Sequence, residues 1–125
     1  MHENEIAKII VDSALAIHRD LGPGLFESVY RKILVSELAS RNLEVETEVP
    51  VEVFYRGTKV DLGFRADIIV CKKVIVETKS IEAIAQVHHK QLLTHLRLKQ
   101  LKLGLLINFN VALLKNGLHR IVNGL

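Results

Sequence analysis

Apolar residues recur at helical spacing in the N-terminal third of the chain, and this pattern predicts two helices. Residues 4–20 carry an apolar stripe with the three- and four-residue spacing of an amphipathic helix. The Gly22-Pro23-Gly24 segment is expected to end this helix and turn the chain. A second helix is predicted over residues 25–41. The apolar residues expected to face inward from it are Phe26, Val29, Tyr30, Ile33, Leu34 and Leu38.

From residue 45 the spacing of apolar residues changes from helical to alternating, which predicts strands. A first strand over residues 45–55 leads into a turn at Arg56-Gly57. A second strand follows over residues 58–70, with a bend expected at Gly63. A three-residue turn then leads to a third strand over residues 74–79. The second and third strands contain nearly continuous apolar runs, which indicates that both faces of the sheet are covered there.

The C-terminal part returns to helical spacing and then predicts a buried strand. The helix is expected over residues 81–100 and the strand over residues 102–108, and a right-handed crossover places that strand parallel to residues 74–79. An Asn-Gly turn signal predicts a terminal ribbon of residues 111–115 and 118–123, with a short helix over 111–115 as the alternative. The whole pattern predicts an α/β fold with a mixed sheet flanked by helices.

Composition places the chain among ordinary globular proteins. Its 125 residues fit one domain over residues 1–125, with 49% hydrophobic and 25% charged residues. The single cysteine, Cys71, excludes an internal disulfide, and no apolar run reaches the ~18 residues of a membrane span. The acidic N-terminus is unlike a secretory signal, so a cytoplasmic protein without membrane contact is expected. A net charge of +3 is compatible with a polyanionic partner, while 5% aromatic residues leave little for base-stacking platforms.

The predicted hairpin between the second and third strands brings two carboxylates together. With a three-residue turn, Asp67 falls opposite Glu77, and cross-strand neighbours have Cβ atoms about 4.5–5.5 Å apart. Side chains alternate along a strand, so Lys79 shares the face of Glu77 and Arg65 shares the face of Asp67. The sequence therefore predicts two acids and two bases on one face of a hairpin.

Two acids placed this way repel each other, and something must relieve the repulsion. At ~5 Å and an effective dielectric constant of ~20, the repulsion costs about 3 kcal/mol. One solution is a divalent cation, Mg²⁺ or Mn²⁺, held by Asp67 and Glu77, with Lys79 assisting an attacking water. The alternative is that Lys79 and Arg65 simply pair with the two acids on an exposed face.

These residues carry a family resemblance. Asp67, a hairpin, and then Glu77-Thr78-Lys79 resemble the PD-(D/E)XK nuclease superfamily. Gly24, Glu27 and Tyr30 match G-x-x-E-x-x-Y, which resembles the GxxExxY proteins within it. The resemblance implies a restriction-endonuclease-like mixed sheet core flanked by helices. It also implies a metal-dependent nuclease that cleaves nucleic acid, with DNA the expected substrate, in which Asp67 and Glu77 bind Mg²⁺ or Mn²⁺ and Lys79 is catalytic.

Further residues have an expected place in this site. Glu27 is predicted as a third metal ligand and catalytic residue, or else as an acid that satisfies the start of its helix. Gln91 and His95 lie four residues apart and resemble the Q-x-x-x-Y element of RecB-like nucleases, with His95 where that element has Tyr. Gln91 is expected to be catalytic, and His95, Tyr30 and Arg65 to contact substrate. For Gln91 and His95 the alternative is a polar edge of the helix without a role in the site. For Tyr30 a place in the core is the alternative.

Two other functions fit the same pattern. The first is a non-catalytic module that binds nucleic acid or protein on the same fold, although the presence of Asp67, Glu77 and Lys79 argues against it. The second is a homodimeric arrangement, because a nuclease core of 125 residues has little surface with which to grip a duplex.

Overall fold

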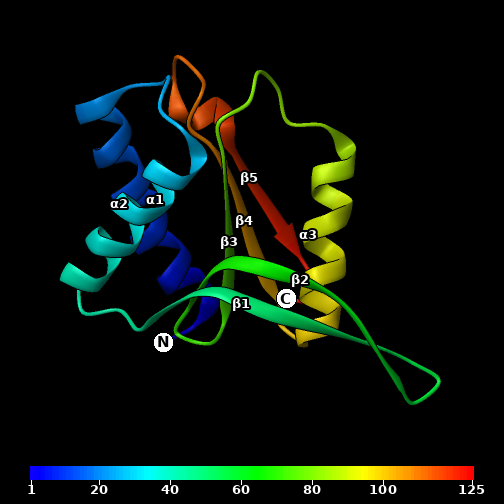
Figure 1. Cartoon of the computed structure of the whole chain (residues 1–125). Coiled ribbons are helices and arrows are strands. Elements are labelled where there is room, and N and C mark those ends of the chain that lie inside the picture. Colours follow the sequence, from blue (N-terminus) through cyan, green and yellow to red (C-terminus); the bar gives the residue numbers. More distant parts are fainter.

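Three α-helices and five strands make up the protein (Figure 1). The computed structural model describes the backbone of residues 1–125 and the side chains of all residues except 61–63. The elements, in chain order, are α1 (Glu3–Leu21), α2 (Glu27–Ser40), β1 (Val45–Tyr55), β2 (Thr58–Val70), β3 (Val74–Lys79), α3 (Gln86–Lys99), β4 (Leu103–Asn108), the 3-10 helix η1 (Leu114–Gly117) and β5 (Leu118–Val122).

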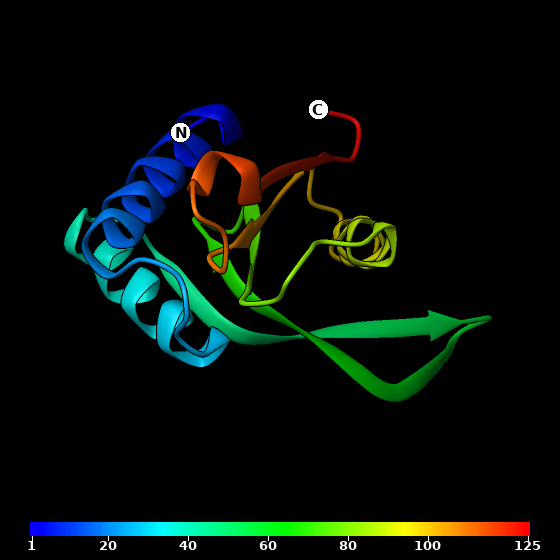
Figure 2. The same cartoon turned by 90° about the horizontal axis from the view of Figure 1, so that it is seen from above.

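The strands form one mixed sheet in the order β1-β2-β3-β4-β5. β1, β2 and β3 are consecutive antiparallel neighbours, β3 and β4 are parallel, and β5 pairs antiparallel with β4. The predicted meander and the predicted crossover through α3 are therefore confirmed. Figure 2 shows α1 and α2 on one side of the sheet and α3 on the other. The prediction of a mixed sheet flanked by helices, as in the restriction-endonuclease-like fold, is confirmed.

Two apolar clusters, one on each face of the sheet, hold these layers together. The first joins α1 and α2 to the sheet through residues such as Ile10, Leu34 and Val76. The second joins α3 to the opposite face through residues such as Ile75 and Leu92. Because β3 contributes alternate residues to the two clusters, both of its faces are buried. β3 is consequently the fixed central element from which the candidate site is built.

The β2–β3 hairpin has the predicted register. Ile68 pairs with Val76, and Val70 pairs with Val74 across a three-residue turn. The amide of Lys73 donates to the carbonyl of Val70 at 3.0 Å and closes this turn. The turn length therefore fixes which residues of the two strands lie side by side.

The start of α3 differs from the prediction. The helix begins at Gln86 rather than at residue 81. The buried side chain of Asn108 holds the preceding loop, because it accepts from the amide of Ile81 at 3.2 Å and donates to the carbonyl of Ile81 at 2.9 Å. These side-chain bonds satisfy backbone groups that a helix would otherwise use.

Two residues expected inside α2 lie at the surface. Phe26 is 82% exposed and Val29 is also exposed, whereas Tyr30, Leu34 and Leu38 are buried as predicted. Phe26 is the N-cap of α2 with an extended backbone, so its side chain does not follow the helical stripe. The error for Phe26 arises because the helical spacing was extended one residue beyond the start of α2.

The predicted terminal ribbon is wrong. Residues 114–117 form the 3-10 helix η1, and β5 pairs with β4 instead of with residues 111–115. This pairing satisfies the edge of β4, whose residues are all buried. The alternative of a short helix is nearer to the structure, although the helix starts three residues later than expected.

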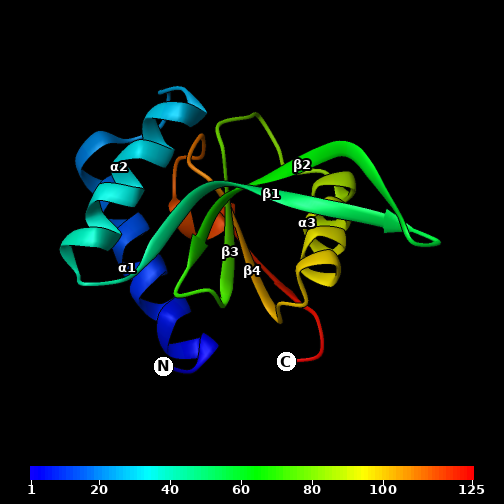
Figure 3. The ribbon, with the colours of Figure 1, turned by 60° about the horizontal axis from the view of Figure 1, so that its bottom comes forward.

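The β1–β2 hairpin extends beyond the body of the protein, past α3 (Figures 1 and 3). Its two-residue turn is the predicted one, since Tyr55 pairs with Thr58 and both Arg56 and Gly57 have positive φ, 49° and 78°. Positive φ at both central residues is the pattern of a type I′ turn. We call residues 52–60 of this hairpin the arm. The bend expected at Gly63 falls outside the residues whose side chains are described.

No helix in the described part of the chain is both long enough and apolar enough to cross a membrane.

Candidate active site at the β2–β3 hairpin

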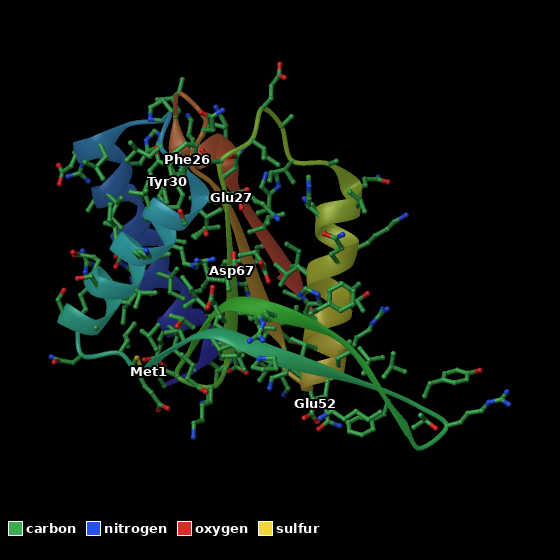
Figure 4. All side chains as sticks on the ribbon, viewed as in Figure 1. Met1, Phe26, Glu27, Tyr30, Glu52 and Asp67 are labelled. Carbon is green, nitrogen blue, oxygen red and sulfur yellow. The ribbon has the colours of Figure 1, made fainter. Side chains whose placement is uncertain are left out.

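Asp67 and Glu77 lie next to each other on neighbouring strands, as predicted. The last paired residues of the hairpin are Ile68 and Val76, directly next to these two acids, and the Asp67 carboxylate accepts a hydrogen bond from the amide of Thr78 at 3.2 Å. Their side chains are only 23% and 12% exposed, so the pair is largely removed from water. Figure 4 shows Asp67 beside β3, where the β1–β2 hairpin crosses.

The ionisation of Asp67 reports this crowding. Burial and the neighbouring charge of Glu77 raise the pKa of Asp67 from its usual value to about 6, against the lowering effect of the Thr78 amide. A carboxylate pair with one raised pKa is the electrostatic state that a bound cation would relieve.

His95 of α3 approaches the second acid of the pair. Its Nδ1 lies 3.5 Å from Oε1 of Glu77, within the reach of an ion pair. Both atoms are nevertheless buried, and neither has a hydrogen-bond partner among the described residues. An oriented carboxylate oxygen without a partner is costly unless a ligand uses it. The Glu77 oxygen therefore fits a role in holding a cation.

Arg31 of α2 approaches the first acid. Its guanidinium lies 4.0 Å from Oδ1 of Asp67 and 3.4 Å from Oε1 of Glu48. Glu48 occupies the β1 position opposite Asp67 and has a φ of 49°, an uncommon conformation for a residue other than glycine. Sequence reasoning did not single out Arg31, although its spacing of four residues from Glu27 on α2 was an available signal.

Lys79 is the last residue of β3, the strand that also carries Glu77. It follows Glu77 by two residues, so its side chain leaves β3 on the same face, and it is half-buried. The carbonyl of Lys79 accepts from the amide of Phe109 at 2.9 Å, which fixes the end of the strand. Among the described residues, no acid forms an ion pair with Lys79.

Arg65 does not pair with the acids either. Its side chain is exposed and donates to the backbone carbonyl of Glu48 at 3.3 Å. The alternative in which Lys79 and Arg65 neutralise Asp67 and Glu77 on an exposed face therefore does not describe this structure within its described residues.

Glu27 lies at the end of β3 but holds backbone rather than joining the acid pair. Its carboxylate accepts from the amide of Ser80 at 3.4 Å, and the Ser80 hydroxyl donates to the carbonyl of Leu25 at 2.6 Å. Figure 4 shows Glu27 at the start of α2, away from Asp67 along β3. The structure thus connects Glu27 to the residue that follows Lys79.

Tyr30 occupies the core, the alternative stated for it from the sequence. Its ring is fully buried and stacks on Phe109, with centroids 4.4 Å apart and planes 5° from parallel. Its hydroxyl donates to the carbonyl of Gly22 and accepts from the amide of Leu25 at 3.2 Å. These contacts fix the loop before α2, and they leave the hydroxyl engaged within the protein.

Gln91 and His95 open onto one small cavity. Gln91 is exposed, and together with His95, Phe64, Lys90 and Thr94 it lines a hollow of about 190 Å³. The Phe64 ring packs against His95 at a centroid distance of 5.0 Å. The cavity therefore reaches from solvent to the imidazole that contacts Glu77.

The donor set of the site suits a hard divalent cation. Among the described residues, no group of three His, Cys, Asp or Glu side chains could together hold a metal, and the donor set at this point is the two carboxylates of Asp67 and Glu77. Mg²⁺ is commonly held by one or two carboxylates, with waters and substrate oxygens as its other ligands. The partnerless oxygen of Glu77 and the raised pKa of Asp67 fit such an ion.

The comparison with protein families agrees with this geometry. A model of the PD-(D/E)XK nuclease superfamily matches residues 4–121, a span that contains every residue of the site. Searches of curated proteins and of solved structures found no match. The superfamily predicted from Asp67, Glu77 and Lys79 is confirmed: this chain belongs to the PD-(D/E)XK nuclease superfamily.

Proposed function

We propose that the protein is a nuclease that hydrolyses phosphodiester bonds of nucleic acid with Mg²⁺ or Mn²⁺. The observation that carries the proposal is the buried pair of Asp67 and Glu77, one with a raised pKa and the other with an oxygen that has no hydrogen-bond partner among the described residues. Membership of a nuclease superfamily supports the same reaction class. DNA is the substrate we propose for it.

In this proposal Asp67 and Glu77 hold the cation through their carboxylates. The cation, when bound, lowers the pKa of a water molecule and neutralises charge on a phosphate oxygen. The ammonium group of Lys79, free of ion pairs with the described acids, orients the attacking water or stabilises the negative charge that develops on the phosphate.

The surrounding residues position this machinery. His95 orients the Glu77 carboxylate from α3, and Arg31 limits the motion of the Asp67 carboxylate from α2. Glu27 fixes the backbone directly after Lys79 through Ser80, which makes it a positioning residue rather than a metal ligand. Gln91 lies at the mouth of the cavity, where it can contact substrate.

We also propose that the chain is one of the GxxExxY proteins. Gly24 of that motif lies in the loop before α2, and the hydroxyl of Tyr30 holds this loop. Glu27 holds the backbone just after β3. A cytoplasmic location remains a prediction from the single cysteine.

A cleavage assay with a lysine variant tests the proposed function. Purified protein is incubated with duplex and single-stranded DNA and RNA in Mg²⁺, in Mn²⁺ or in EDTA. We expect cleavage only with a divalent cation, and a loss of about a hundredfold or more in Lys79→Ala, since removing one positioned group from a charged transition state costs about that much.

Lys102→Ala is the matched control. Lys102 is exposed and adjoins the start of β4, at the opposite end of the sheet from Lys79, so its loss should leave cleavage unchanged. Equal cleavage by the unmodified protein and by Lys79→Ala would identify a contaminating nuclease. Binding of nucleic acid that needs no cation, without any cleavage, would favour a non-catalytic module.

A further inference from the structure

The arm, residues 52–60, projects beyond the packed part of the molecule. Val51 is the last fully buried residue of β1, and the turn at Arg56 lies five residues further along. At about 3.3 Å per residue the tip stands roughly 17 Å beyond the core. Figures 1 and 3 both show the arm passing α3 and ending away from the body. The arm continues the β1–β2 pairing of the sheet, and the exposed side chains at its tip are available to a partner.

The tip combines exposed aromatic rings with cations. Phe54 and Tyr55 are 59% and 64% exposed, and the guanidinium of Arg56 lies 5.3 Å above the Tyr55 ring. Lys59 forms an ion pair with Glu52 at 3.3 Å, and this pair neutralises the negative charge of Glu52. Apolar side chains accompanied by arginine are the means by which proteins enter DNA grooves.

The helix facing the arm has no acidic residue. α3 carries Lys90, Arg97 and Lys99 together with three histidines, and no Asp or Glu. Its end and the base of the arm line a hollow of about 470 Å³, which is formed by Leu98 and Lys99 of α3 and by Pro50, Glu52 and Phe54 of β1. A polyanion lying between the arm and α3 would therefore meet Lys99 from α3, and from the described residues of the arm it would meet an acid, Glu52, whose charge is compensated by Lys59.

A separate hollow on the same helix lies closer to the proposed catalytic pair. Further along the same helix, the second hollow of about 190 Å³ lies between Phe64 of β2 and the side chains of Lys90, Gln91 and His95. His95 in turn lies 3.5 Å from Glu77. The two hollows follow the side of α3 that faces the β1–β2 hairpin, and they end at the imidazole beside the acids.

We propose that the arm and α3 together grip double-stranded nucleic acid, with the arm lying in a groove of the duplex. This inference rests on the proposed nuclease function and specifies its substrate as a duplex. The major groove of B-DNA is about 12 Å wide and 8.5 Å deep and admits a two-stranded β-ribbon. An arm of roughly 17 Å reaches across such a groove.

The arrangement of the rings favours a duplex over a single strand. Phe54 and Tyr55 are consecutive in β1, so they point to opposite faces of the ribbon. Single-strand binding needs successive rings on one surface, on which consecutive bases stack. Rings on opposite faces instead suit a ribbon that contacts both walls of a groove.

Equilibrium binding measures the contribution of the arm separately from catalysis. We use Lys79→Ala protein with Mg²⁺, a fluorescent duplex of about 20 base pairs, which is about two helical turns, and a single strand of equal length. The arm variant Tyr55→Ser/Arg56→Asn is compared with Leu15→Ser/Arg19→Asn. The latter removes an exposed apolar and an exposed basic residue from α1, on the other side of the sheet.

We expect the Lys79→Ala parent to prefer the duplex over the single strand, and the arm variant to lose about tenfold or more in duplex affinity. The α1 variant should retain its affinity within about twofold. Arg56→Asn alone creates Asn-Gly, the preferred type I′ turn sequence, so the hairpin is kept while the charge is removed. This single variant should lower the slope of log affinity against log salt by about one.

Several results would overturn the inference. Unchanged duplex affinity in both arm variants would do so, whatever the cleavage assay shows. Cleavage of single strands by the unmodified protein, without duplex binding by the Lys79→Ala parent, would overturn the arm proposal and leave the nuclease function standing. A change from dimer to monomer in the arm variant, with duplex affinity kept, would assign the arm to contacts between copies. Absence of both binding and cleavage would remove the proposed function as well.

Discussion

The surroundings of the Asp67 carboxyl destabilise its negative charge. It is mostly buried and faces Glu77, while Arg31 approaches only to 4.0 Å, so its pKa is raised to about 6. A site that is strained when empty and relaxed when a cation binds gains affinity from that relief. Among the described residues no acid forms an ion pair with Lys79, so its ammonium group is available for the role proposed for it.

The raised pKa predicts how the metal-free protein responds to pH. The folded state takes up a proton near pH 6 and the unfolded state near pH 4, so between these values folding binds a proton. Stability without metal should therefore fall as pH rises from about 4 to 7. We expect Asp67 to contribute about 1–2 kcal/mol to this fall once solvent screening is included.

Urea unfolding in EDTA across this pH range measures the effect. Asp67→Asn should flatten the pH dependence, and Mg²⁺ should restore stability to the unmodified protein at pH 7 but not to the variant. A metal-free protein that becomes steadily more stable between pH 4 and 7 by the same amount in both proteins would contradict this account of the acid pair.

His95 offers a second test at the scale of a single residue. It faces Glu77 from α3, and losing a group that orients a metal ligand typically costs 10–100-fold in metal affinity. We expect His95→Ala to weaken Mn²⁺ binding by about tenfold and His95→Asn to lose less, because the asparagine amide can face Glu77 in a similar way. Thr94→Ala, at the exposed neighbouring position, is the control. Calorimetry with Mn²⁺ measures the binding directly, and equal affinities for the Ala and Asn variants would argue against an orienting contact.

At the scale of elements, the end of β4 organises the loop that precedes α3. Asn108 is buried and makes three hydrogen bonds, two to the backbone of Ile81 and one from the amide of Asn110. This loop leaves β3 directly after Lys79 and Ser80. The position of β3 and the position of α3 are thus coupled through one amide side chain.

Removing that side chain should be costly. Asn108→Ala leaves buried backbone groups without partners, and we expect a loss of about 2–4 kcal/mol in the free energy of unfolding. Asn110→Ala, at an exposed position with one side-chain contact of 3.4 Å to the Ile81 carbonyl, should cost less than about 1 kcal/mol. Urea denaturation measures both values, and a cost for Asn108→Ala as small as that for Asn110→Ala would show that the loop is held by other contacts.

At the scale of the whole molecule, contacts set by the local sequence pattern could be predicted, whereas contacts between elements far apart in the sequence could not. The pairing of Asp67 with Glu77 follows from a turn of three residues, and so it could be predicted from the sequence. The contact of His95 with Glu77 could not, because it depends on how α3 crosses the sheet. The prediction of a terminal ribbon was wrong for the same reason, since β5 pairs with β4 rather than with the residues just before it in the sequence.

The outward position of the arm also lies beyond sequence reasoning. Alternation predicted strands over both of its sides, and Arg56-Gly57 predicted its turn. Nothing in the alternation indicated that the strands would continue past α3, because a half-buried strand and a projecting strand have the same spacing of apolar residues. The exposure of Phe54 and Tyr55 depends on the tertiary arrangement of the elements, so the sequence alone did not indicate it.

The short turn between β2 and β3 limits where this protein can change during evolution. Residues 71–73 join the two strands, and Cys71 and Lys72 both have positive φ, 52° and 55°. One residue inserted there would shift the pairing by one position and rotate one acid to the far side of the sheet, which would separate the two cation ligands without disturbing either strand. The loop over residues 81–85 contributes no acid of the proposed cation pair, so additions there would leave the pair intact. Lineages of this protein should therefore vary in length after β3 and keep the length of the turn before it.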